Sequence, residues 1–112
     1  MCSKNLLNEI LQKIAVETKN IYGSKLESVI LFGSYARGDY NDESDIDILL
    51  LVDLPETELV NYRRLIEALC GQLLFEYGIV VSAIEKDLNT YNKYSKALPF
   101  YMNIQKEGVK IA

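Results

Sequence analysis

The sequence contains no histidine, and this absence excludes several common kinds of active site. A triad with an imidazole base, an imidazole general acid and an ordinary zinc site all depend on histidine. Cysteine is also scarce: Cys2 and Cys70 do not have the spacing of a metal-binding pair, and we interpret them as free thiols in a reducing compartment. A catalytic site in this chain has to be built from other side chains.

The sequence also lacks a long apolar run and an excess of positive charge. No apolar segment approaches the roughly 20 residues that cross a bilayer, and residues 1–5 lack the apolar core of a signal peptide. We therefore expect a cytoplasmic protein with no membrane partner. The net charge of −4 disfavours broad nucleic-acid binding. Acidic residues crowd between Asp39 and Glu58, whereas five lysines and three acidic residues occur from Glu85 onward, so the acidic cluster favours a local cation site.

Length and composition favour one folded unit. The 112 residues are 49% hydrophobic and 25% charged, which is typical of a single globular domain, and we expect one domain over residues 1–112. Apolar residues at three- and four-residue steps predict an amphipathic helix from about Leu6 to Ile21. Ser3 or Asn5 can cap its start, and Gly23 can end it.

Three apolar runs predict buried β-strands at residues 28–32, 46–52 and 79–84. A last helix is predicted from Pro99 to about Glu107, because proline suits a first helical turn, and the pattern between residues 86 and 98 is weak. The order helix, strand, strand, helix, strand, helix predicts an α/β (α+β) fold in which helices flank a small mixed sheet.

A long helix is predicted between the second and third strands. It follows Pro55 and ends at Gly78. Gly71 lies inside it, where glycine suggests close packing on the sheet. The apolar positions of the helix predict a buried face that consists of Leu59, Tyr62, Leu65, Ile66, Leu69, Leu73 and Leu74.

The segment with the clearest chemical meaning ends in Asp45 and Asp47. These residues are two positions apart at the start of a strand, so their side chains project from one face, roughly 6–7 Å apart at Cα. Two such carboxylates repel each other unless a cation lies between them, and their oxygens suit Mg²⁺ or Mn²⁺. The structural alternative is a pair of solvated residues at a strand entrance, which would leave the motif before them as a coincidence.

That motif, Gly33-Ser34, ends the preceding buried strand. Glycine lets a ligand approach the backbone, the Ser34 hydroxyl can bind an oxyanion, and a helical turn over residues 35–38 would favour a phosphate. The fork of Arg37 suits phosphate oxygens, although a surface pair with Asp39 or Glu43 is an equal alternative. A phosphate cradle beside a metal-holding pair describes a nucleoside triphosphate site.

Gly-Ser, ten residues and Asp-x-Asp together resemble the signature of the DNA polymerase beta-like nucleotidyltransferases. The form Gly-Ser-Tyr-Ala-Arg-Gly-Asp with Ser-Asp-Ile-Asp is similar to the minimal nucleotidyltransferases, and the resemblance covers the whole chain. It implies the palm-like nucleotidyltransferase fold and AMP transfer from ATP with two Mg²⁺ ions at Asp45 and Asp47. Gly33, Ser34 and Arg37 would then hold the triphosphate. The resemblance also implies an antitoxin of a toxin–antitoxin system whose partner and AMP acceptor is a HEPN-domain toxin.

One position departs from that family. Its members usually have a third carboxylate on the strand after the long helix, and we place Ser82 there, as a neutral and weaker ligand of the cofactor. Glu85 is the nearest acid, but strict alternation puts it on the opposite face from Ser82. A rival hypothesis is therefore a catalytically inactive module of the same fold that neutralises its partner by contact.

Two further alternatives stay open at this stage. A small molecule or an RNA end is a less favoured acceptor, because the chain shows no basic groove for it. The aromatic residues Tyr91, Tyr94, Phe100 and Tyr101 could pack in the core or form a partner-binding surface. Both homo- and hetero-oligomers are compatible with the sequence.

Overall fold

The computed structural model describes residues 3–112, so Cys2 lies outside the described part of the chain. Four strands form one mixed sheet in the order β3-β2-β1-β4. β1 is antiparallel to both of its neighbours, and β2 and β3 are parallel. The strands span Leu26–Phe32 (β1), Ile46–Val52 (β2), Val81–Asp87 (β3) and Val109–Lys110 (β4). The predicted α/β sandwich is confirmed, with β4 as an edge strand that the sequence pattern does not show.

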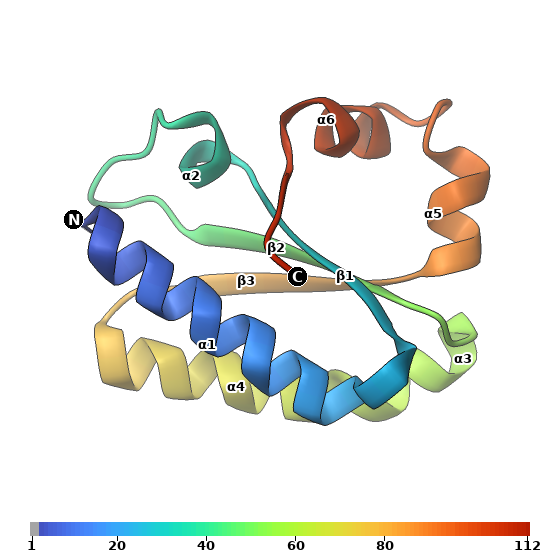
Figure 1. Cartoon of the computed structure of the whole chain (residues 1–112), viewed down its shortest axis with the longest axis horizontal. Helices are drawn as coiled ribbons and strands as arrows, with labels where there is room; N and C mark the ends of the chain where they lie inside the picture. Colours follow the sequence, from blue (N-terminus) through green and yellow to red (C-terminus); the bar gives the residue numbers. More distant parts are fainter. Residues whose placement is uncertain (1–2) are drawn as a thin grey trace.

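Helices cover the two faces of the sheet unequally (Figure 1). The long helices α1 (Lys4–Tyr22) and α4 (Arg63–Tyr77) lie under one face, and the short helices α5 (Leu88–Tyr94) and α6 (Pro99–Glu107) lie at the other. The central strand β2 supplies both cores, since its side chains alternate between the faces. Ile48 and Leu50 join the larger cluster with α1 and α4, whereas Leu49 and Leu51 join a smaller cluster beside α5 and α6.

The first helix forms as predicted. The backbone N–H of Leu6 donates to the Ser3 hydroxyl at 3.1 Å, so Ser3 is the N-cap. Gly23, with φ of 62°, ends the helix and begins the short 3-10 turn η1 (Gly23–Lys25). Ile10 and Ile14 are buried at helical spacing, which ties α1 to the larger cluster.

The helix predicted after Pro55 is interrupted, and two details of that prediction are wrong. It consists of α3 (Glu56–Leu59), the 3-10 turn η2 (Val60–Tyr62) and α4. Leu65 and Leu74 are 52% and 47% exposed, because a helix on a flat sheet buries a narrow stripe, here Ile66, Leu69 and Leu73. A Cβ on Gly71 would meet no atom within 4 Å, so this glycine does not serve close packing on the sheet.

The C-terminal part contains a helix that the sequence pattern does not show clearly. α5 begins after Asp87, whose carboxylate accepts the backbone N–H of Thr90 at 2.9 Å. α6 begins at Pro99 and stops before Gly108, as predicted. The aromatic residues divide between the two alternatives: Tyr91 and Tyr101 are buried, whereas Tyr94 and Phe100 are exposed.

None of the helices in residues 3–112 has the length and apolar character that crossing a membrane requires.

Candidate active site

The predicted site residues lie at one end of the sheet, where β1 ends and β2 and β3 begin. Asp47 is paired with Phe32 of β1 on one side and with Ser82 of β3 on the other. Paired residues of neighbouring strands point to the same face, so Ser82 lies beside Asp47. The register thus agrees with the position that we assigned to Ser82 from the sequence.

Gly33 lies against the carboxylate of Asp47. Its backbone has φ of 75° and ψ of −157°, a region that is almost restricted to glycine. A Cβ at this position would overlap with Oδ2 of Asp47. Both conformation and contact therefore require glycine here, and they hold the motif that the sequence predicts to bind phosphate directly next to the carboxylate.

After Gly33, the chain makes the short helix α2 (Ser34–Arg37), which matches the helical turn considered for residues 35–38. The amide N–H of Gly38 donates to the carbonyl of Ser34 at 2.9 Å and closes this turn. The rings of Tyr35 and Tyr40 stack with their centroids 4.2 Å apart, and Tyr35 is buried in the larger core. The stack holds α2 to the following loop, a role that the sequence reasoning missed.

A pocket of about 390 Å³ lies between α2 and α6. It brings together Gly33, Ser34, Arg37 and Asp47 from the predicted set. Asp45 is exposed and instead lines an adjacent pocket of about 340 Å³ with residues of the same loop. The remaining lining residues of the first pocket are Phe32, Phe100, Asn103, Ile104 and Glu107. Sequence reasoning missed the contribution of α6, because no local pattern shows that α6 folds back beside Gly33.

The electrostatics of Asp47 favour a cation. Partial burial raises the pKa of the Asp47 carboxyl, the nearby charge of Asp45 raises it further, and Arg37 opposes both effects. The mutual repulsion expected between the two carboxylates is therefore present. A bound cation would offset that repulsion and favour the charged form of Asp47.

Arg37 spans the mouth of the pocket through two surface ion pairs. Its Nε lies 3.2 Å from Oδ2 of Asp39, and one terminal nitrogen lies 3.5 Å from Oε2 of Glu107 on α6. Asp39, and secondarily Glu107, raise the pKa of this exposed guanidinium. The surface pair with Asp39 that the sequence left open is therefore formed, while Arg37 still lines the pocket.

Glu85 lies on the opposite face from Ser82, as strict alternation requires. The hydroxyl of Tyr22 donates a hydrogen bond to its carboxylate, and burial together with this carboxylate raises the pKa of Tyr22. Glu85 is thus held by Tyr22 on the face of the sheet opposite Asp47. Within residues 3–112, no group of three or more acidic, cysteine or histidine residues could hold a metal ion.

The oxygens at this site nevertheless fit Mg²⁺. This ion keeps several water ligands and is usually bound through one or two carboxylates and the phosphates of a substrate. Asp45 and Asp47 supply two carboxylates, and the Ser82 hydroxyl is a neutral oxygen beside them. The donor set therefore suits a metal that arrives with a nucleotide better than a permanently bound one.

The fold and the site together define a nucleotidyltransferase, and comparison with known proteins gives the family. Residues 11–111 match the family described as "Nucleotidyltransferase domain". The chain belongs to this family of enzymes.

Two relatives from Methanocaldococcus jannaschii carry closely similar names. "Putative protein adenylyltransferase MJ0604" is 42% identical over 90 residues, covering 80% of this chain and 82% of the relative. "Putative protein adenylyltransferase MJ0141" is 35% identical over 103 residues, covering 92% and 96%.

Solved structures share the fold at lower identity. A chain of a toxin–antitoxin crystal structure with AMP-PNP has a TM-score of 0.55 and 20% identity, covering 91% of this chain and 72% of that one. A chain from a structure of the tri-AMPylated Shewanella oneidensis HEPN toxin in complex with MNT antitoxin has a TM-score of 0.52 and 19% identity, covering 94% and 71%. These likenesses concern the fold.

Proposed function

We propose that this chain transfers AMP from ATP to a hydroxyl group of a partner protein, with Mg²⁺ held by Asp45 and Asp47. The observation that carries the proposal is the contact between Gly33 and Asp47: the backbone that we propose for phosphate binding lies directly against a carboxylate whose surroundings favour a cation. The names of the relatives support protein adenylylation as the reaction. We infer that residues 1–112 act as one minimal nucleotidyltransferase domain.

Three residues of the pocket have separate tasks in the proposed reaction. The absence of a side chain at Gly33 admits the triphosphate, and the Ser34 hydroxyl donates to a phosphate oxygen. Arg37 binds phosphate with its fork when it exchanges the carboxylate of Glu107 for the nucleotide. Bound Mg²⁺ supplies neutralisation of phosphate charge and helps to align the in-line attack. The acceptor oxygen forms a bond to the α-phosphorus, the bond from the α-phosphorus to the bridging oxygen of pyrophosphate breaks, and the hydroxyl proton passes to solvent as pyrophosphate leaves.

We further propose that the acceptor is a HEPN-type toxin and that the chain is its antitoxin in the cytoplasm. The fold is shared with a chain from a complex of an AMPylated HEPN toxin and an MNT antitoxin. A toxin hydroxyl that carries AMP would lose its own chemistry, so the transfer itself would neutralise the toxin.

The test incubates the purified chain with Mg²⁺ and the protein encoded by the neighbouring gene, using ATP labelled at the α or the γ phosphate. We expect label on the partner from α-labelled ATP alone. Asp45→Asn and Asp47→Asn should each lower the rate by about 10²-fold or more, because they remove charge that acts in the transition state. Asp53→Asn is the matched control, since Asp53 is an exposed carboxylate just after the far end of β2 and should leave the rate unchanged. Label from γ-labelled ATP would contradict the proposal.

The second candidate function is a binding module that neutralises the partner by contact. It is favoured by one arrangement: Ser82 stands beside Asp47, while Glu85 is held by Tyr22 on the other face. This candidate predicts a stable complex without label from either ATP, and a gain of Mg²⁺-dependent transfer in Ser82→Asp. Efficient transfer by the natural chain would exclude it.

A further inference from the structure

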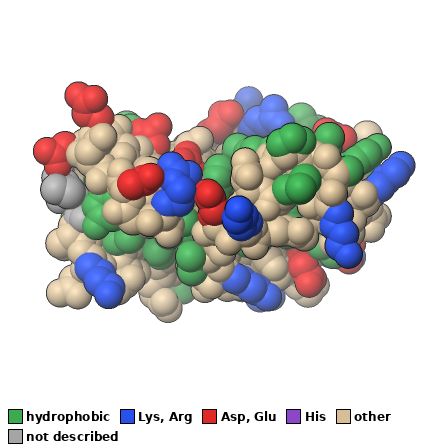
Figure 2. Space-filling model, turned by 90° about the horizontal axis from the view of Figure 1, so that it is seen from above, with side chains coloured by type: hydrophobic (Ala, Val, Ile, Leu, Met, Phe, Trp, Pro, Cys, Tyr) green, Lys and Arg blue, Asp and Glu red, His purple; other side chains and the backbone are tan. Residues whose placement is uncertain are grey.

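Basic and acidic residues are unevenly distributed along the chain. The whole chain has 12 basic and 16 acidic residues, but residues 88–112 contain four lysines and one acidic residue, Glu107. Seen from above, acidic side chains gather over α2 and its following loop, whereas hydrophobic and basic side chains gather over α5 and α6 (Figure 2). The C-terminal helices therefore form a basic surface on an acidic protein.

An apolar stripe crosses this surface. Tyr94, Leu98 and Met102 follow one another at four-residue steps and are 37%, 44% and 47% exposed. The N–H of Leu98 donates to the carbonyl of Tyr94, and that of Met102 to the carbonyl of Leu98, each at 3.0 Å. These bonds link α5 through the turn to α6, and Leu98, the extended N-cap of α6, lies between the two helices.

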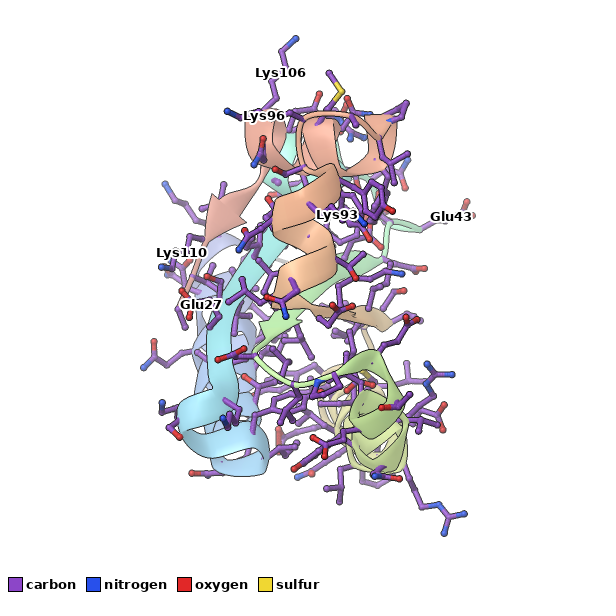
Figure 3. All side chains as sticks on the ribbon, turned by 90° about the vertical axis from the view of Figure 1, so that its right-hand side faces the viewer. Glu27, Glu43, Lys93, Lys96, Lys106 and Lys110 are labelled. Carbon is purple, nitrogen blue, oxygen red and sulfur yellow. The ribbon has the colours of Figure 1, made fainter. Side chains whose placement is uncertain are left out.

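Three lysines border the stripe. Lys93 and Lys96 lie beside Tyr94 and Leu98 in sequence, and Lys106 is one further step of four after Met102; all three are exposed. Figure 3 shows Lys93 on α5 and Lys96 and Lys106 around α6. None of the three forms an ion pair within residues 3–112, and Nζ of Lys93 lies over the ring of Tyr94, 5.3 Å from its centroid. Their charges are available to a partner.

The stripe includes a residue of α6, the helix that forms one wall of the proposed active site. Phe100, between Leu98 and Met102 in sequence, lines the pocket together with Asp47 and is itself partly exposed. Its ring packs edge-on against Phe32, with centroids 5.7 Å apart, and this contact fixes α6 beside the end of β1. Met102 is two positions from Phe100 and projects from the other side of α6, so a molecule bound to the stripe would lie across α6 from the pocket.

We propose that the acceptor protein docks on the α5–α6 surface, formed by Tyr94, Leu98, Met102 and the three lysines, through a patch of acidic and apolar side chains. This proposal rests on the function proposed above, because it assumes that the acceptor is a protein. Unpaired lysines around an apolar stripe are complementary to carboxylates around an apolar patch. A nucleic acid is less favoured, since Leu98 and Met102 offer no ring for stacking on bases and the rest of the chain is acidic.

Charge reversal tests the docking. The variant carries Lys93→Glu, Lys96→Glu and Lys106→Glu, and the probe is the purified protein encoded by the neighbouring gene. We expect its Kd to rise about tenfold or more at low salt, with a smaller change at high salt, because interface charges act mainly through screened attraction. The matched control carries Lys4→Glu, Lys19→Glu and Lys25→Glu, three exposed lysines on α1 and η1, and should bind as the natural chain does. Equal effects of the two triple variants would overturn the proposal.

A second experiment tests the apolar stripe. Leu98→Ala with Met102→Ala should weaken partner binding by about tenfold, whereas Phe75→Ala, which removes a 93% exposed ring from α4, should not change it. A photoreactive phenylalanine analogue at position 102 should crosslink to the partner, and the same analogue at position 75 should not. Crosslinking from position 75 alone would place the partner on α4 and end the proposal.

Two readouts separate this proposal from the proposed function. Binding of AMP-PNP with Mg²⁺ should be the same in the natural chain and in the triple variants, which shows that the pocket is intact. Partner binding is measured without ATP and so does not depend on AMP transfer. If the natural chain transfers no AMP but charge reversal still weakens partner binding, the proposed reaction is wrong and the proposed docking surface stands. Charge reversal could instead leave partner binding unchanged and dissociate a homodimer or abolish binding of a labelled RNA. Either result would assign the surface to that other ligand and overturn the proposal.

Discussion

The two faces of the sheet are built from the same strands but are covered very differently. On one face, α1 and α4 bury Ile46, Ile48, Leu50 and Val52 of β2 completely. On the other, α5 and α6 cover Leu49 and Leu51 but leave the start of the strand uncovered, and Asp47 lies there. Side chains of β2 alternate between the faces. The residues that point to one face are buried, and on the other face Asp47 of the proposed site points out at the start of the strand.

This difference shows how a small enzyme can hold charge beside its core. On the closed face, the polar groups within reach are paired, as Tyr22 and Glu85 are. On the open face, partial burial and the charge of Asp45 raise the pKa of the Asp47 carboxyl. Arg37 opposes this rise but does not cancel it. The open face is therefore destabilised in the absence of a ligand, and ligand binding can offset that cost.

The largest expected effect comes from breaking the closed face. Leu50 is fully buried, so Leu50→Ala should lower the free energy of unfolding by about 2–5 kcal/mol through lost burial and an added cavity. Leu65→Ala makes the same change at a half-exposed position of α4 and should cost about 0.5 kcal/mol or less. Urea denaturation of the two variants measures both values. Equal costs would show that the closed face is not the main source of stability.

A smaller effect is expected at the boundary between the faces. Gly33→Ala forces alanine into a conformation with positive φ, which costs about 1–3 kcal/mol, and places a methyl group against Asp47. Nucleotide binding should be lost as well. The control is Gly71→Ala, which has open space around it in a helix and should stabilise the chain by about 0.5–1 kcal/mol. A Gly33→Ala variant that binds AMP-PNP normally would show that this contact does not shape the site.

The smallest expected effect is a gain in stability. Folding raises the pKa of Asp47, so the ionised carboxylate opposes folding at neutral pH, and metal-free Asp47→Asn should melt slightly higher than the natural chain, because solvent screens much of the effect at this partly exposed group. The gain should be complete above the folded pKa and should vanish as the pH falls below the unfolded pKa, because Asp47 is then neutral in both states. Thermal melts between acidic and neutral pH measure this difference. A lower melting temperature for Asp47→Asn at neutral pH would contradict it.

Local sequence patterns predicted the structure correctly where the pattern of a single strand face or a single helix end was sufficient. The strand over residues 46–52, the Ser3 cap and the start of α6 at Pro99 follow from local patterns, and the structure confirms them. Leu65, Leu74 and Gly71 were misjudged because a helical pattern cannot show how wide a stripe the sheet will cover. The helix at residues 88–94 was missed because Tyr91 is its buried residue, so the segment shows no apolar period.

The sequence by itself determined the chemistry of this protein, since the spacing of Gly33-Ser34 and Asp45-x-Asp47 and the alternation along β3 are properties of the chain. Only the tertiary structure decided which distant residues share the pocket. Pairing of β4 with β1 and the contact of Phe100 with Phe32 bring α6 beside Gly33, and with it Glu107, which pairs with Arg37. Such contacts depend on packing between segments about 70 positions apart, for which no local period exists in the sequence.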